Sequence, residues 1–167
     1  MKTLYESILN EYSSNDRDEV VNFINANYNG TKIDVSTAPD KNGMYIASYN
    51  GYVEVKNKNI TKLTNGMFVW GSANGSFYCD NCQNLISLEG APKKIKNGSF
   101  TCMQCISLKT LEGAPEEVSN DFNCVFCDSL KSLEGAPNKC GLFDGEDCGF
   151  TEGAIRKVCD VAGEIYV

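Results

Sequence analysis

Hydrophobic positions near the N-terminus recur at helical spacing. In residues 1–12 the apolar side chains follow one another at intervals of one and three residues, which places them on one face of a helix. A second helix is predicted after the capping candidates Ser13–Asn15 and is expected to end at Asn29–Gly30. Its apolar side consists of Val20, Val21, Ile24 and Tyr28. Residues 1–30 are therefore predicted to form an N-terminal helical cap.

Beyond Gly30 the hydrophobic pattern changes to a period of two, which is typical of strands. The alternating segments are Lys32–Val35, Met44–Tyr49 and Tyr52–Val55. Asn50–Gly51 lies between two of these segments and predicts a hairpin turn. Residues 31–52 are thus predicted to be a strand and hairpin segment that joins the cap to the rest of the chain.

The middle of the chain is repetitive. The motif Phe-x-Cys-x-x-Cys begins at Phe77, Phe100 and Phe122, and each copy is followed by Leu-x-x-Leu-Glu-Gly-Ala-Pro. Fainter copies begin at Val53 and Phe143. The five starting positions are separated by 24, 23, 22 and 21 residues. This period fits one short strand, a buried turn and a return segment per coil, so residues 53–150 are predicted to form a solenoid with a parallel sheet.

A single coil of this length cannot bury its own Phe and Leu side chains, so the end coils need covers. Phenylalanines from successive strands should stack about 4.8 Å apart and form an apolar ladder. At the C-terminal end, Thr151 is predicted to cap a helix that Gly163 stops. The apolar face of that helix would consist of Ile155, Val158, Cys159 and Ala162. Residues 164–167 are predicted to be a short strand beside the helix, and residues 151–167 form the second cap.

The Phe, Cys, Cys and Leu positions of the repeat resemble the core pattern of the leucine-rich-repeat family over roughly residues 53–150. More narrowly, the cysteines followed by Leu-x-x-Leu-Glu-Gly-Ala-Pro resemble cysteine-rich repeat proteins of bacteriophages and bacteria. This resemblance implies a mainly β, leucine-rich-repeat-like solenoid with irregular convex loops. A role as a structural or accessory protein of a phage is an expectation that follows from the resemblance alone.

Composition narrows the range of functions. The chain has 167 residues, is 42% hydrophobic and carries a formal charge of −7, with no basic run, so nucleic acids and anionic membranes are disfavoured as partners. It contains no histidine and none of the common catalytic motifs, so we expect no enzymatic activity. No segment approaches the length of a membrane span, and a cytoplasmic location is expected.

Nine cysteines raise the question of a metal site. The three Cys-x-x-Cys pairs have spacings near those of zinc sites. The repeat period fixes these spacings whether or not metal binds, however, and three pairs supply more thiols than the four of a closed zinc site. We therefore interpret the cysteines as small core residues and expect no cofactor, with a structural zinc or iron–sulfur site as the alternative. The cysteines concerned are Cys79, Cys82, Cys102, Cys105, Cys124 and Cys127.

A second repeated column consists of Glu89, Glu112 and Glu134, each followed by a glycine. Carboxylates about 5 Å apart in water repel each other by less than about 1 kcal/mol per pair, so the column is tolerable if each carboxylate accepts backbone N–H bonds. A calcium-binding edge is the lesser alternative, because calcium needs oxygen atoms that converge on one point.

Residues between the inward-facing positions are predicted to form an open face of the sheet. Several apolar side chains from adjacent coils would gather there, with acidic residues toward the C-terminal end. This pattern favours a non-enzymatic module that binds a protein partner, with scattered surface residues as the other interpretation. The candidate binding residues are Tyr78, Thr101, Met103, Gln104, Asn123, Val125 and Phe126.

Overall fold

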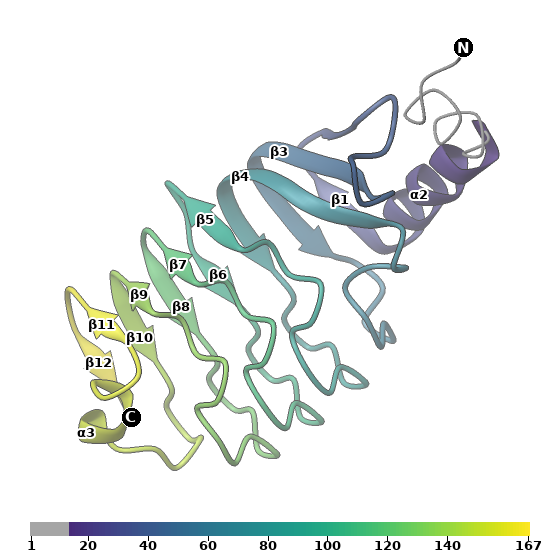
Figure 1. The fold of residues 1–167 in the computed structure, drawn as a ribbon. Helices are drawn as coiled ribbons and strands as arrows, with labels where there is room; N and C mark the ends of the chain where they lie inside the picture. Colours follow the sequence, from purple (N-terminus) through teal and green to yellow (C-terminus); the bar gives the residue numbers. More distant parts are fainter. Residues whose placement is uncertain (1–13) are drawn as a thin grey trace.

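The computed structural model describes residues 14–167 and has the form of a β-solenoid whose coils stack side by side (Figure 1). The helix predicted within residues 1–12 lies outside the described residues. Helix α2 (Ser14–Asn27) confirms the second predicted helix, with Val20 and Ile24 buried against the first strands. Tyr28 does not continue this helix, because it begins strand β1 (Tyr28–Gly30).

Within residues 14–167, twelve strands form one sheet. Two long neighbours, β3 (Tyr45–Val55) and β4 (Phe68–Tyr78), begin the parallel part. Each later coil contributes two short strands in place of one long strand. These pairs are β5 (Lys94–Lys96) with β6 (Phe100–Thr101), β7 (Glu117–Val118) with β8 (Asp121–Asn123), β9 (Lys139–Cys140) with β10 (Leu142–Asp144), and β11 (Asp160–Val161) with β12 (Ile165–Tyr166).

The strand register confirms the predicted starts of the coils. Val53 pairs with Phe77, Phe77 with Phe100, Phe100 with Phe122, and Phe122 with Phe143, all in parallel. Phe143 then pairs with Ile165 of β12, so the predicted last strand extends the same sheet. The mainly β solenoid with a parallel sheet is thereby established.

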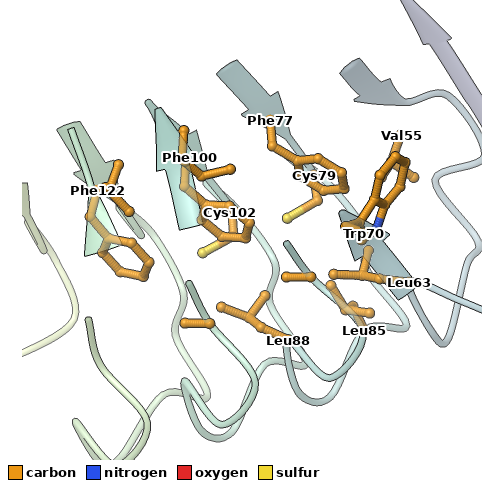
Figure 2. Close-up of a cluster of buried hydrophobic side chains, with 14 of the residues drawn as sticks. Val55, Leu63, Trp70, Phe77, Cys79, Leu85, Leu88, Phe100, Cys102 and Phe122 are labelled. Atoms are coloured by element: carbon orange, nitrogen blue, oxygen red, sulfur yellow. The ribbon is translucent and has the colours of Figure 1, made fainter. Parts of the chain in front are cut away.

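The phenylalanine ladder lies inside this stack. The rings of Phe77 and Phe100 are parallel with centroids 5.7 Å apart, and those of Phe100 and Phe122 are 5.6 Å apart. Phe143 continues the row with a tilted ring at 5.2 Å. Figure 2 shows the rings in a row beside the cysteines, with the leucines of the turns beneath them. These side chains are fully buried, which follows from the inward orientation of alternate strand residues.

An aromatic cluster closes the N-terminal end of the ladder. Trp70 meets Tyr28, Tyr49, Phe68 and Phe77 in T-shaped contacts with centroid distances of 5.4 to 5.8 Å. Its indole Nε1 is buried without a hydrogen-bond partner within residues 14–167. The surrounding rings offer it the weaker contacts that an N–H group makes with an aromatic face.

The prediction of a hairpin turn at Asn50–Gly51 is wrong. Strand β3 runs straight through both residues, and Gly51 has a φ of +125° within the strand. The edge of β3 is covered instead by β1 and by β2 (Ile33–Val35), which both pair with it in antiparallel fashion. The N-terminal cap therefore consists of α2 and two antiparallel strands.

The C-terminal helix is shorter than predicted. Thr151 caps α3 (Glu152–Ile155) as expected, and its side chain accepts a hydrogen bond from the Ala154 N–H. The chain then leaves the helix, because Val161 pairs with Cys140 in the sheet and completes a column of buried residues. Val158, expected on the buried face, is 44% exposed.

Glycines allow the coils to approach closely at the turns. Gly113 has a φ of +87°, and a Cβ atom there would lie 2.4 Å from the Cα of Glu89. Gly135 has the same relationship to Glu112 in the next coil. A side chain at these positions would collide with backbone, so the glycine of the Glu-Gly-Ala-Pro segment sets the spacing of the coils. Among the described helices, none is long and apolar enough to cross a membrane.

Candidate interaction face and cysteine columns

Part of the predicted binding face forms one row across the strands. Tyr78, Thr101 and Asn123 occupy matching positions in the parallel register, and Asp144 and Tyr166 continue the row. The side chain of Asn123 donates to Asp144 Oδ2 at 2.9 Å. This row is half-buried to exposed, and Asp144 is its one acidic member.

The next residues along the coils form the Cys-x-x-Cys turns, and here the prediction needs a correction. Val125 is 4% exposed, so it faces inward and is not available to a partner. Met103 is half-buried, and its N–H donates to Asp80 Oδ1 at 2.8 Å. The turn is folded by such contacts between carboxylate or amide side chains and the backbone, which re-aim the side chains that follow. Strand alternation could not predict this change of direction.

The second position of each turn is left-handed. Asn81, Gln104, Phe126 and Asp147 have φ values of +59°, +56°, +57° and +61°. Asn and Asp tolerate this conformation, whereas a bulky aromatic residue rarely adopts it. Phe126 is also 44% exposed, so much of this side chain faces solvent on a strained backbone. Gln104 and Phe126 are adjacent in this column and both point to solvent.

Two exposed isoleucines were not among the predicted face residues. Ile86 is 56% exposed and Ile106 is 45% exposed. Both lie in the turns, Ile106 directly after Cys105 and Ile86 directly after Leu85. The repeat itself could have revealed them, because the equivalent positions in other coils are polar and therefore exposed. Ile106 corresponds to Gln83 and Asp128, and Ile86 corresponds to Lys109 and Lys131.

Seven of the nine cysteines form two columns in the core. The first contains Cys79, Cys102 and Cys124, and the second contains Cys82, Cys105, Cys127 and Cys148. All are buried except Cys148, which is half-buried. Thiols of the second column donate to backbone carbonyls of the preceding coil, from Cys105 to Cys79 and from Cys127 to Cys102, both at 3.1 Å. The side chains thus act as small core residues that also satisfy buried carbonyl groups.

The thiols meet in pairs and do not surround a common point. Cys140 and Cys159 lie with their sulfur atoms 3.5 Å apart. Within residues 14–167 there is no group of three or more Cys, Asp or Glu residues arranged to hold a metal ion. The zinc or iron–sulfur alternative for the Cys-x-x-Cys pairs therefore receives no support from their geometry, and neither does the calcium edge.

Burial affects the acid–base chemistry of these thiols. Loss of water raises the pKa of Cys79 well above its usual value, and nearby thiols add to the shift. Cys148 behaves differently, because its side-chain hydrogen bonding with Cys124 lowers the pKa of Cys148 to about 7. Cys148 is therefore the thiol of the second column that combines access to solvent with thiolate character.

The glutamate column lies on the outside of the return segments. Glu89, Glu112 and Glu134 are exposed, and the bonds between coils are made by their backbone carbonyls. The carbonyl of Glu112 accepts from Leu88 N–H at 2.9 Å, and that of Glu134 accepts from Leu111 N–H at 3.0 Å. The prediction that the carboxylates accept backbone N–H bonds is not confirmed, because the backbone carbonyls of these residues accept the bonds between coils.

The fold and the faces described above define a β-solenoid with cysteine-lined coils. Comparison of the chain with family models, with curated proteins and with solved structures finds no match.

Proposed function

We propose that the protein is a non-enzymatic interaction module that binds a protein partner through the outer face around Phe126. The observation that carries the proposal is the conformation of this residue. An exposed phenylalanine occupies a left-handed position where other coils place Asn, Gln or Asp. A strained and exposed aromatic residue reduces stability, and such strain is a feature of functional surfaces.

The surroundings of Phe126 support a protein partner. Exposed aromatic and aliphatic residues act as anchors in protein interfaces, and a polar rim shields them from water. Gln104 and Met103 lie on the preceding coil, and the acidic residues Glu146 and Asp147 lie on the following coil. A partner with an apolar pocket bordered by basic residues would complement this surface.

The leucine-rich-repeat-like character of the coils belongs to the same proposal. Solenoids of this kind contact partners with a rigid, extended sheet surface. The continuous ladder of parallel strands from β4 to β12 supplies such a surface here.

Phe126→Asn tests the proposed function. The immobilised wild-type protein and the variant are exposed to the same extract, and bound proteins are compared quantitatively. We expect at least one protein that the wild type enriches to be lost by Phe126→Asn. The matched control is Ile86→Asn, which removes another exposed apolar side chain outside the left-handed column. Identical enrichment by the wild type and Phe126→Asn, or equal loss in both variants, would place the binding surface elsewhere.

A further inference from the structure

Two return segments, residues 62–66 and 89–93, stack less closely than those of the later coils. In the later coils a Cβ atom on the turn glycine would lie 2.4 and 2.5 Å from the backbone nitrogen of the preceding coil. At Gly90 the same distance, to the backbone nitrogen of Thr64, is 3.2 Å. A Cβ atom on Gly66 would meet nothing within 4 Å. The gap between these two segments is therefore widened.

The hydrogen bonding of the first return segment explains the wider gap. In the next coil the Leu88 N–H donates to the Glu112 carbonyl at 2.9 Å and joins two return segments. Leu63 occupies the position equivalent to Leu88, and within residues 14–167 its N–H makes no such bond to the Glu89 carbonyl. The Leu63 carbonyl accepts a hydrogen bond from the Tyr28 hydroxyl, which holds the first segment to the N-terminal cap. The first segment is therefore attached to the cap and not to the second segment at this point.

A cavity of about 510 Å³ lies in the widened gap. This volume is within the range of about 300–1,000 Å³ that is usual for ligand pockets. Part of the lining is apolar and open to solvent, because Val69 on β4 is 43% exposed and Met44 is half-buried. Trp70 also lines the cavity. The cavity thus offers apolar surface to a ligand of small-molecule size.

Two lysines of the lining depart from the repeat. Lys62 and Lys93 are exposed, and neither forms an ion pair with another residue of the described chain. The later coils have neutral or acidic residues at the equivalent positions, which are Ser87, Thr110 and Ser132 for the first lysine and Glu116 and Asn138 for the second. Glu89 is the single carboxylate in the lining, so the cavity is net positive on a protein whose formal charge is −7. A cleft lined by one sign of charge attracts ligands of the opposite sign.

We propose that this cavity binds a small organic acid, in which a carboxylate is attached to an apolar body. The apolar body would pack against Val69 and Met44, and the carboxylate would lie near the ammonium groups of Lys62 and Lys93. A neutral analogue lacks the charge and an inorganic anion lacks the apolar body, so both would bind more weakly. This site is separate from the Phe126 surface, which lies in the turns of later coils.

A fragment library of small organic acids, their amides and amines is the probe. The chain has one tryptophan, so the indole N–H of Trp70 gives a single NMR signal at the cavity, and the Gly66 amide gives a second. We expect acids to dominate the fragments that shift both signals and leave the Gly149 amide, near α3, unchanged. If no fragment shifts both signals, or if amides or amines dominate, the proposal is overturned.

The tightest-binding acid is then compared with its own amide and with inorganic phosphate. The amide should bind at least tenfold more weakly, because it has no charge to interact with the lysines. Phosphate should leave the Trp70 and Gly66 signals unchanged at concentrations where the acid saturates them. Phosphate that binds as tightly as the acid would show that the apolar body makes no contact, and an equally tight amide would show that the lysines make none.

Charge variants provide a matched comparison. Lys62→Ser/Lys93→Asn introduces residues that later coils have at the equivalent positions, and it should weaken binding of the acid at least tenfold. Lys109→Ser/Lys131→Asn removes two exposed lysines that do not line the cavity, with the same change in net charge, and should leave binding unchanged. Equal weakening in both double variants would contradict the proposed contacts.

Two single variants separate the apolar contact from the proposed function. Val69→Ser should weaken binding of the acid and of its amide alike, because it removes apolar surface and no charge. Unchanged binding in this variant would show that the ligand does not pack against Val69 and would overturn the proposed site. Phe126→Asn should bind the acid like the wild type, so the result is independent of whether the Phe126 surface binds a protein.

Discussion

The thiol of Cys127 donates to the carbonyl oxygen of Cys102 in the preceding coil at 3.1 Å. The same relationship links Cys148 to Cys124 at 3.0 Å. Backbone carbonyls at a buried turn lie beyond the ends of the short strands, so they need partners other than the ladder. A cysteine is small enough for the core and still supplies a weak donor. This dual property gives a physical reason for cysteine at the same place in successive coils.

Removal of this donor should destabilise the protein. We expect Cys127→Ala to lower the free energy of unfolding by about 1–3 kcal/mol, the usual cost of a buried polar group left without a partner. Cys127→Ser retains a donor and should cost less. Urea denaturation followed by fluorescence of Trp70 measures both variants. If the serine variant is as unstable as the alanine variant, packing and not hydrogen bonding explains the column.

Phe126→Asn should make the protein more stable. Asparagine adopts the left-handed conformation at lower cost, and 44% of Phe126 already faces solvent, so only the covered part of the ring is lost. We expect the free energy of unfolding to rise by about 1 kcal/mol. The neighbouring change Val125→Asn should do the opposite, because it places an amide at a site that is 4% exposed. A loss of stability in Phe126→Asn would show that the ring contributes to the fold.

Gly113→Ala should be strongly destabilising. The new Cβ would lie 2.4 Å from backbone atoms of Glu89, and the φ of +87° is unfavourable for alanine. Because the obstacle is backbone, the coils must separate locally, and we expect a loss of more than about 2 kcal/mol. Gly153→Ala is the control, since a Cβ there meets nothing within 4 Å and lies in helix α3. Thermal denaturation of both variants measures this difference, and we expect a lower melting temperature for Gly113→Ala. Similar melting temperatures would show that close approach of the coils at Gly113 is not required for stability.

The repeat predicted the stacking accurately because identical side chains must occupy identical places in successive coils. Phe77, Phe100 and Phe122 pair in register at the expected positions. The hairpin prediction failed because it judged Asn50–Gly51 in isolation. The same dipeptide recurs at Asn74–Gly75 and at Asn97–Gly98, and the Asn74 side chain donates to Asn50 at 2.7 Å. Recurrence at the repeat period indicates a column within the sheet, not a local turn.

Other errors came from interactions that a local pattern does not contain. Residues after Thr151 do have helical spacing. However, pairing of Val161 beside Cys140 in the sheet stabilises this segment more than extension of a short helix would. Val125 lies in the turn between Cys124 and Cys127, where the alternation of a strand no longer applies, and it is buried there.

Cys148 should be the first thiol to react with iodoacetamide. The thiolate is the reactive form, and side-chain hydrogen bonding with Cys124 lowers the pKa of Cys148 to about 7. The alkylation rate should therefore rise with pH around a midpoint near 7 and level off by pH 8–9, where an ordinary thiol with its higher pKa would still be increasing. Cys79, whose pKa burial raises, should react only on unfolding. Mass spectrometry of partially labelled protein identifies the site, and Cys148→Ser is the control that should abolish the fast phase. A fast phase that persists in this variant, or a midpoint near the usual thiol pKa, would show that the pairing of Cys148 with Cys124 does not control reactivity.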